Sequence, residues 1–391
     1  MKLRNLLFGT MVACAFVACS NDDDPTPNPN PTPEAGTVNL DISIETKDAL
    51  VSKAIQSGDE KKINTLAIFV FDAESGDQLA KAWIDNTEKT DPQTSAHFAG
   101  LPAGAKVRCA AYANIEEEET EKVTGIEQTL AVSIPADGFK PDALPMVGFT
   151  PVNEVLTLVS GKVNEVTVSL ERTVSRVDVV SLVFDITQNS KYKEMYKGFQ
   201  EALFDVDGFS INGVSSSAVT NEADDKCEAF WGGLKVGAFG NTDQTDFYLK
   251  GIADFQSNLV GGEASFSQEG ESAVILFDKN EAAPLVSFYV LPNQSKKLTQ
   301  LVLEGKFGYT MENSTVAKST SYYPVVIARD NNANGGSDLA SNGEIASNKV
   351  YRISITVAGP GKDIDGKGKP ELSVSTEVAD YTPIEQKVVV E

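Results

Sequence analysis

Apolar and polar residues alternate along the chain from residue 37 onward. In the stretch TVNLDISIE, one side of the pattern consists of Val38, Leu40, Ile42 and Ile44, and the other side is polar or acidic. The side chains of a β-strand point alternately to its two faces. This period of two therefore predicts a strand with one buried face and one solvated face.

Similar segments follow over most of the chain. Residues 66–72, LAIFVFD, are almost entirely apolar and predict a strand that is buried on both faces. The turn sequence ESGD separates them from residues 78–83, which predicts a β-hairpin. Further strands are predicted at 106–114, 155–161, 162–171, 174–186, 273–278, 285–292, 298–311, 350–359 and 371–381. Short strands separated by turns indicate a mostly β protein built from β-sandwich domains.

The middle of the chain predicts one helix and two tight turns. Asn189 or Ser190 is a suitable N-cap for this helix. The apolar residues that follow helical spacing are Tyr192, Met195, Tyr196, Phe199 and Leu203. Asp-Gly and Asn-Gly in residues 206–215 are typical of hairpin turns. We place a domain boundary near Arg172, where one strand-rich stretch ends and another begins.

The first residues have the pattern of a lipoprotein leader. Lys2 and Arg4 precede the apolar residues 6–18, a stretch of about 20 Å as a helix, which is too short to cross a hydrocarbon core of about 30 Å. This stretch ends in FVAC and resembles a bacterial lipobox, in which Cys19 would be acylated; the MVAC at Cys14 is a weaker match. The SNDDD that follows resembles the export tag of Bacteroidetes surface lipoproteins. No later segment predicts a transmembrane helix.

Prolines occupy every second position from residue 25 to residue 33. Proline prevents helix formation and ladder pairing, so residues 20–36 are predicted to form an extended spacer between the lipid anchor and the folded part.

Composition and charge exclude several classes of function. The 391 residues contain 33 Lys and Arg against 56 Asp and Glu, for a net charge of −23. Such a surface is unsuited to nucleic acid, which needs clustered cations. His97 is the single histidine, so sites that need several histidines, such as multi-histidine zinc centres, are excluded. No pattern indicates a metal or another cofactor. Cys109 and Cys227 are expected to be unpaired buried thiols, because they lie in different predicted domains; a disulfide between them, which the oxidising envelope permits, is the alternative.

Four stretches, in this order, carry a resemblance to a known family. They are INTLAIFVFDAESG, FAGLPAGAKVRCAAYAN, LERTVSRVDV and SFYVLPN. Together with the lipoprotein leader they are similar to the major fimbrial subunits of Bacteroidetes, the FimA-like fimbrillins or type V pilins. The resemblance implies two tandem transthyretin-like β-sandwich domains with one or few short helices. The implied divisions are a leader (1–19), a spacer (20–36), a pro-segment with the first strand (37–53), an N-terminal domain (54–171) and a C-terminal domain (172–391).

The resemblance also implies a mechanism of assembly. A trypsin-like protease removes the leader and first strand, and a strand from a neighbouring subunit fills the groove that is left. The corresponding cleavage site in this chain lies between Lys53 and Ala54, with Lys47 as the second choice. The displaced strand would be the one that carries Val38, Leu40, Ile42 and Ile44. The family usually has arginine at the cleavage site, so lysine leaves the protease unidentified.

The C-terminal end supplies a candidate donor strand. Residues 384–391, IEQKVVVE, carry Ile384, Val388 and Val390. An apolar strand at a free end is an aggregation hazard unless it has a partner, and adding it to an open sheet edge is a known mode of recognition. Residues 371–378 could instead be the last strand of the second domain.

The leading hypothesis is therefore a non-enzymatic pilin. Its precursor would be lipid-anchored at the outer membrane, as a palmitate-bearing lipoprotein, and its mature form would lie in extracellular fimbriae that support adhesion and biofilm formation. Expected partners are other copies of the chain, minor pilus subunits, the protease, and host or bacterial surface receptors. The alternatives are a tip or anchor subunit of the same pilus, a glycan-binding surface lipoprotein, or a glycosidase that uses two carboxylates.

Overall fold

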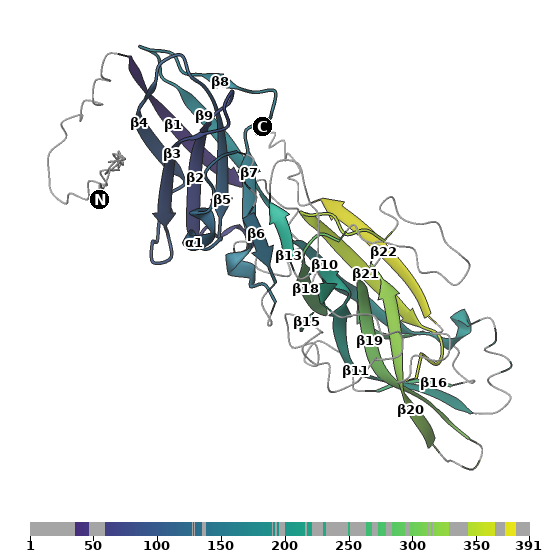
Figure 1. Cartoon of the computed structure of the whole chain (residues 1–391). Helices are drawn as coiled ribbons and strands as arrows, with labels where there is room; N and C mark the ends of the chain where they lie inside the picture. The colour runs from purple at the N-terminus through teal and green to yellow at the C-terminus, as the bar shows by residue number, and fades with distance from the viewer. Residues whose placement is uncertain are drawn as a thin grey trace, which may run out of the picture.

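The structure is a computed structural model, in which the sheets of the first half of the chain lie at one end and those of the second half at the other (Figure 1). The residues that it describes are 36–46, 59–126, 128, 130–134, 138–189, 191, 194, 200–215, 217–220, 230–231, 249–250, 263–267, 273–278, 284–293, 298–311, 313, 316–327, 343–363 and 372–380.

The first half of the chain forms an eight-stranded sheet that closes around its own core. The strand order is β3-β2-β5-β7-β9-β1-β4, and β8 pairs with β5. The sheet has two layers, one that contains β3, β2, β5 and β7 and one that contains β1 and β4. Strand β9 connects these layers, because its first six residues pair with β1 and its last two pair with β7. The strands of this sheet are β1 (Thr37–Thr46), β2 (Thr65–Asp72), β3 (Gln78–Asp85), β4 (Ser95–Pro102), β5 (Lys106–Ala113), β7 (Met146–Phe149), β8 (Leu156–Thr157) and β9 (Glu165–Arg172). Strand β6 (Leu130–Ser133) lies outside this sheet.

Strand β2 is buried on both faces, as its apolar sequence predicted. Leu66, Ile68 and Val70 face the core shared with β1, β4 and β9. Phe69 and Phe71 on its other face belong to a second core, together with apolar residues of the segment that joins β5 to β7. The antiparallel pairing of β2 with β3 confirms the predicted hairpin.

The second half of the chain forms two five-stranded sheets. One has the order β17-β10-β21-β22, with β18 also paired to β10, and the other has the order β15-β11-β19-β20, with β16 also paired to β11. The strands of these two sheets are β10 (Ser175–Phe184), β11 (Glu201–Asn212), β15 (Leu249–Lys250), β16 (Glu263–Ser267), β17 (Val274–Asp278), β18 (Val286–Val290), β19 (Gln300–Thr310), β20 (Val316–Val326), β21 (Lys349–Val357) and β22 (Leu372–Asp380). Strands β12 (Val214–Ser215), β13 (Ser217–Thr220) and β14 (Phe230–Trp231) lie outside them.

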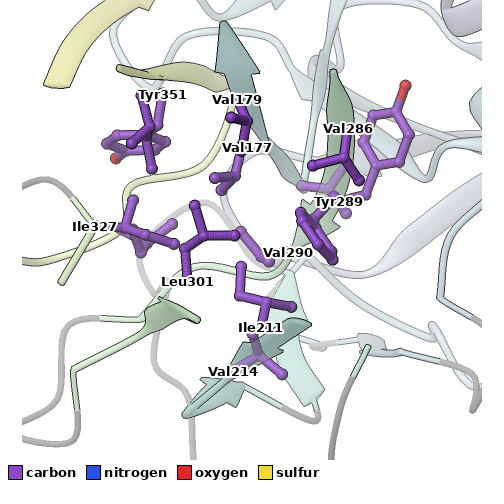
Figure 2. Close-up of a cluster of buried hydrophobic side chains, with 14 of the residues drawn as sticks. Val177, Val179, Ile211, Val214, Val286, Tyr289, Val290, Leu301, Ile327 and Tyr351 are labelled. Carbon is purple, nitrogen blue, oxygen red and sulfur yellow. The ribbon is translucent and has the colours of Figure 1, made fainter. Parts of the chain in front are cut away.

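A continuous apolar core fills the space between these two sheets. Figure 2 shows side chains from both sheets converging, with Val177 and Val179 of β10 near Leu301 of β19 and Ile211 of β11. Deeper in the second half, the rings of Phe184 and Phe204 stack with centroids 5.7 Å apart. The observed elements therefore confirm the expectation of a mostly β protein with β-sandwich packing.

The two halves are joined by more than one link. Only Thr173 and Val174 separate β9 from β10, so the chain passes almost directly from the first set of sheets into the second. Strand β6 of the first half pairs antiparallel with β13 of the second half. The sheets thus change over near Arg172, and the division into two domains there stays a prediction.

The described helices are short. They are α1 (Glu117–Thr120) and the 3₁₀ turns η1 (Asp59–Lys61), η2 (Pro141–Ala143) and η3 (Ile186–Gln188). Tyr192, Met195, Tyr196 and Phe199 of the predicted helix lie outside the described residues.

Two expectations for the middle of the chain are wrong. Leu203, the last residue of the predicted helical stripe, lies in β11, where its backbone pairs with both β16 and β19. The sequence Asp207-Gly208 is not a hairpin turn either, because it lies inside β11 at a bulge between Val206 and Gly208. A β-bulge accepts glycine as readily as a turn does, which explains the misleading signal.

Gly148 of β7 lies where the first-half sheet turns from β5 to β9. A Cβ atom at this position would run into the backbone carbonyl of Ser169 and lie 3.0 Å from Cγ1 of Val168. We expect Gly148→Ala to lower the free energy of unfolding by about 1–3 kcal/mol, because the backbone of β9 must shift. Urea denaturation measures this difference, and an unchanged midpoint would contradict the tight approach of β7 to β9.

Candidate functional site

The site with the clearest functional geometry is the place that β1 occupies in the first-half sheet. Strand β1 pairs antiparallel with β4 on one side and parallel with β9 on the other. Its main chain is therefore bonded along both edges. Inward-facing partners across the two ladders are Val38–Leu101, Leu40–Phe98, Ile42–Ala96, Ile42–Val166 and Ile44–Val168.

The predicted amphipathic pattern of β1 is present in the structure. Val38, Leu40, Ile42 and Ile44 have exposed fractions of 2%, 0%, 0% and 7%. All four belong to one core cluster with the inner faces of β2, β5, β4 and β9. At about 1.5–3 kcal/mol for each buried aliphatic side chain, they supply roughly 6–12 kcal/mol of gross apolar stabilisation.

Hydrogen bonds at both edges fix the register of β1. Asp41 donates its backbone N–H to the carbonyl oxygen of Asn164 over 2.9 Å, and the side-chain amide of Asn164 donates to the carbonyl oxygen of Asn39 over 2.9 Å. On the other edge, Ile44 donates its N–H to Thr94 over 2.7 Å. Buried Asn164 thus holds the start of β9 to the middle of β1.

The outer face of β1 makes weaker, exposed contacts. Asp41 and His97 lie opposite each other on β1 and β4, with 2.7 Å between Oδ1 and Nδ1. Their side chains are 47% and 39% exposed, so solvent screens this pair. The Ser169 hydroxyl donates a hydrogen bond to Glu45. The stability of β1 in its place therefore comes mainly from its apolar face.

The free thiol of Cys109 lies on the inner face of β5, in the same core cluster as the apolar side chains of β1. It is 2% exposed and has no disulfide partner, as expected from the sequence. Burial raises the pKa of this thiol to about 12. Cys109 is consequently protonated and shielded at neutral pH as long as β1 covers the core.

A second group of interacting side chains lies where the two halves meet. The junction cluster consists of Glu60, Arg176, Asp178, Ser287 and Tyr289, each at most 4% exposed. The guanidinium of Arg176 lies 2.7 Å from Glu60 and 3.0 Å from Asp178. The Tyr289 hydroxyl donates to Glu60, and the Ser287 hydroxyl donates to Asp178 over 2.7 Å. Glu60, from η1 just before β2, is thereby fixed to β10 and β18 of the second half.

Several predicted site residues lie outside the described residues. They are Cys19 at the lipobox, Lys53 and Ala54 at the cleavage site, Lys47, Cys227, and Ile384, Val388 and Val390 of the donor segment. The strand at 371–381 is present as β22, which pairs with β21 of its own sheet. Within the part of the chain that the structure describes, no helix is both long and apolar enough to span a membrane. In that same part, acidic, cysteine and histidine side chains nowhere gather as a metal-binding group.

Sequence reasoning missed β4, which forms one wall of the groove around β1. Phe98 and Leu101 are its buried residues, and they are three positions apart, which breaks the period of two. The pairing of β4 with β1 contains a register shift between Val38 and Leu40, and this irregularity explains the broken pattern.

The junction cluster was missed as well, because Glu60 lies in the charged sequence DEKK, which is typical of solvated loops.

Comparison with known proteins gives a family for the first half of the chain. Residues 36–184 match the family model of the major fimbrial subunit protein (FimA). The match includes β1, β9 and the start of the second half up to the end of β10. No curated protein matches the chain. The matched family is one of fimbrial subunits, and the match supports a pilin role for this chain.

Solved structures share the fold over most of the chain. A fimbrilin (FimA) from Porphyromonas gingivalis W83 has a TM-score of 0.56 at 15% identity and covers 89% of this chain and 98% of its own. A proposed cell adhesion protein from Parabacteroides distasonis has a TM-score of 0.55 at 16% identity, covering 89% and 98%. One from Bacteroides eggerthii has a TM-score of 0.53 at 14% identity, covering 90% and 98%. The family match and the shared fold confirm the resemblance that the sequence motifs indicated.

Proposed function

Because residues 36–184 match the FimA family and the fold is that of a solved fimbrilin, we propose that the chain is the shaft subunit of a surface fimbria and polymerises by protease-triggered strand exchange. A trypsin-like protease cuts between Lys53 and Ala54 and separates β1 from the rest of the chain. The C-terminal segment of a neighbouring copy, with Ile384, Val388 and Val390, then takes the place of β1. Repetition of this step builds a filament, because each copy both donates and accepts a strand.

The position of β1 is the observation that carries this proposal. β1 is a complete strand with partners on both edges and four buried side chains, yet it reaches β2 only through residues 47–64. A cut in that segment leaves β1 without any covalent link to the core that it fills. Its departure would expose the main-chain edges of both β4 and β9, and an open pair of edges accepts an added strand.

An intact chain is protected from premature assembly by the same contacts. The strand that is joined to its own sheet competes with any donor strand at a high effective concentration. Release of β1 removes this competitor, so polymerisation would follow cutting rather than synthesis. Acylation of Cys19 would hold the precursor at the outer membrane until the protease acts, and the mature fimbriae would support adhesion and biofilm formation.

We expect limited trypsin digestion of the chain from Ser20 onward, in a Cys227→Ser background, to cut after Lys53. Once β1 leaves, the Cys109 thiol reaches solvent and its pKa falls from about 12 toward its ordinary value. Maleimide labelling of Cys109 at pH 7.5 should therefore rise at least tenfold when the reagent is present during the cut, before a donor strand covers the thiol again. Native gel electrophoresis of chains cut without maleimide should show a ladder of oligomers.

Two variants serve as controls for this experiment. Lys53→Gln should resist the cut and leave Cys109 unlabelled, whereas Lys47→Gln should be cut and labelled as the parent chain is. Labelling without a ladder would contradict the shaft role and favour a tip or anchor subunit. A cut that leaves Cys109 shielded would contradict the release of β1 and favour a surface-binding lipoprotein.

A further inference from the structure

The segment between β7 and β9 exposes an unusual amount of apolar surface. We call residues 151–163 the valine segment, because Val152, Val155, Val159 and Val163 are exposed by 65%, 39%, 38% and 76%. Among the described residues, only three other large hydrophobic side chains are exposed to this degree, and they lie in separate strands or loops. Single exposed apolar residues need no explanation, but four in one short segment indicate an interaction surface.

The valine segment lies at the end of the first-half sheet that is far from the second half. β9 runs from this end toward Arg172, from which the chain enters β10, and β1 is parallel to β9. The start of β1 therefore lies beside the valine segment. Gly104 donates its N–H to Leu158 in this segment over 2.7 Å, and neighbouring Ala103 donates to Gly36, just before β1, over 2.9 Å.

The length of the C-terminal segment limits where a donor copy can lie. β22 ends at Asp380, and the donor strand is expected at 384–391. Three residues remain between them, which span about 10 Å when fully extended. The body of the donor copy must therefore touch one end of the groove that β1 leaves. The end near Thr46 adjoins the chain's own second half, so the free end is the one beside the valine segment.

From this geometry we propose that the valine segment is the docking surface for a second copy of this chain, the copy that donates its C-terminal strand. The surface that covers it is the part of the donor next to Asp380, where β22 ends. The contact is heterologous, since the valine segment meets a different part of the partner. It is continuous with the interface that the donated strand forms in the groove. Burial of the exposed valines adds apolar stabilisation to the bonds of the donated strand. This inference rests on the proposed strand exchange.

The test compares a charged variant of the valine segment with a matched variant elsewhere. In the chain from Ser20 onward, Val152→Glu with Val163→Glu places two carboxylates on the docking surface, and both positions are exposed enough to leave folding intact. Val316→Glu, at a position of β20 that is 52% exposed, is the control. After trypsin cutting, light scattering measures polymerisation, and fluorescence anisotropy measures binding of a synthetic peptide of residues 381–391.

We expect the double variant to polymerise at least tenfold more slowly than the parent chain. Its affinity for the peptide should stay within twofold of the parent's. Val316→Glu should match the parent in both the rate of polymerisation and the affinity for the peptide. Equal polymerisation of all three chains would overturn the docking surface while leaving strand exchange intact, and would mean that another partner or none covers the valines. A parallel loss of peptide binding in the double variant would also overturn it, because the valines would then act through the groove. A parent chain that neither binds the peptide nor polymerises would overturn the proposed function and the docking surface together.

Discussion

Alanine in place of both Leu40 and Ile42 is expected to release β1 without any proteolysis. Each side chain is completely buried in the core between the two layers of the first-half sheet. Truncation of a buried Leu or Ile to Ala costs about 2–5 kcal/mol, so the pair costs about 4–10 kcal/mol. That loss is comparable with the roughly 6–12 kcal/mol of gross apolar stabilisation that holds β1 in place.

The uncut double variant should therefore behave like the cut parent chain. In a Cys227→Ser background, maleimide should label Cys109 at least tenfold faster than in the uncut parent, and native gels should show oligomers before trypsin is added. The matched control is Asp41→Asn with Ser43→Ala, on the outer face of the same strand. Its exposed contacts are worth at most about 1 kcal/mol, so β1 should stay in place. Shielding of Cys109 in the Leu40 and Ile42 variant would show that other contacts retain β1.

Arg176→Met is expected to be the most destabilising single substitution at the contact between the two halves. The guanidinium lies between the carboxylates of Glu60 and Asp178, and all three groups are nearly inaccessible to water. Methionine keeps much of the side-chain volume but leaves both carboxylates without their cation. Breaking a buried ion pair by removal of one partner costs about 3–5 kcal/mol, which is a large part of the stability of an ordinary domain.

Urea denaturation of the uncut chain measures this loss as a lower midpoint. Lys306→Met is the matched control, because Lys306 also pairs with a carboxylate, that of Asp207, at 3.0 Å but with 46% and 29% exposed side chains. It should cost about 1 kcal/mol or less. If Glu60→Gln and Asp178→Asn are added to Arg176→Met, the buried charges disappear and part of the stability should return. Equal midpoints for Arg176→Met and Lys306→Met would contradict the role of the junction cluster.

Local patterns in the sequence predicted the strands whose burial is regular. The alternation of β1 and the apolar run of β2 follow directly from which faces are covered, so both were predictable. β4 was not, because its contact with β1 contains a bulge and its two buried residues lose the period of two. Leu203 was assigned to a helix because it lies four residues after Phe199, but β11 is buried on both faces at this point, so an apolar residue there fits a strand equally well.

The candidate site was predictable in part for the same reason. The face of β1 follows from its own residues, whereas the walls of its groove come from β4, β5 and β9, which are distant in sequence. Burial of Glu60 depends on Arg176 and Tyr289, more than 100 residues away, and no local pattern encodes such a contact. The exposed valines lie in a segment that predicts an ordinary strand, since exposure depends on what the rest of the fold leaves uncovered.

The direct passage from β9 into β10 has a mechanical consequence. In the proposed fimbria, a pull along the length of the filament is carried within each copy by the two-residue link at Thr173 and Val174, by the pairing of β6 with β13 and by the junction cluster. On one side of the link β9 is bonded to its neighbours along its whole length, and on the other side β10 is bonded in the same way to β18 and β21. A force along these strands loads many backbone hydrogen bonds in shear at once instead of opening them one by one. Resistance to forced unfolding is governed by the unfolding rate rather than by equilibrium stability, so we expect this arrangement to slow forced unfolding.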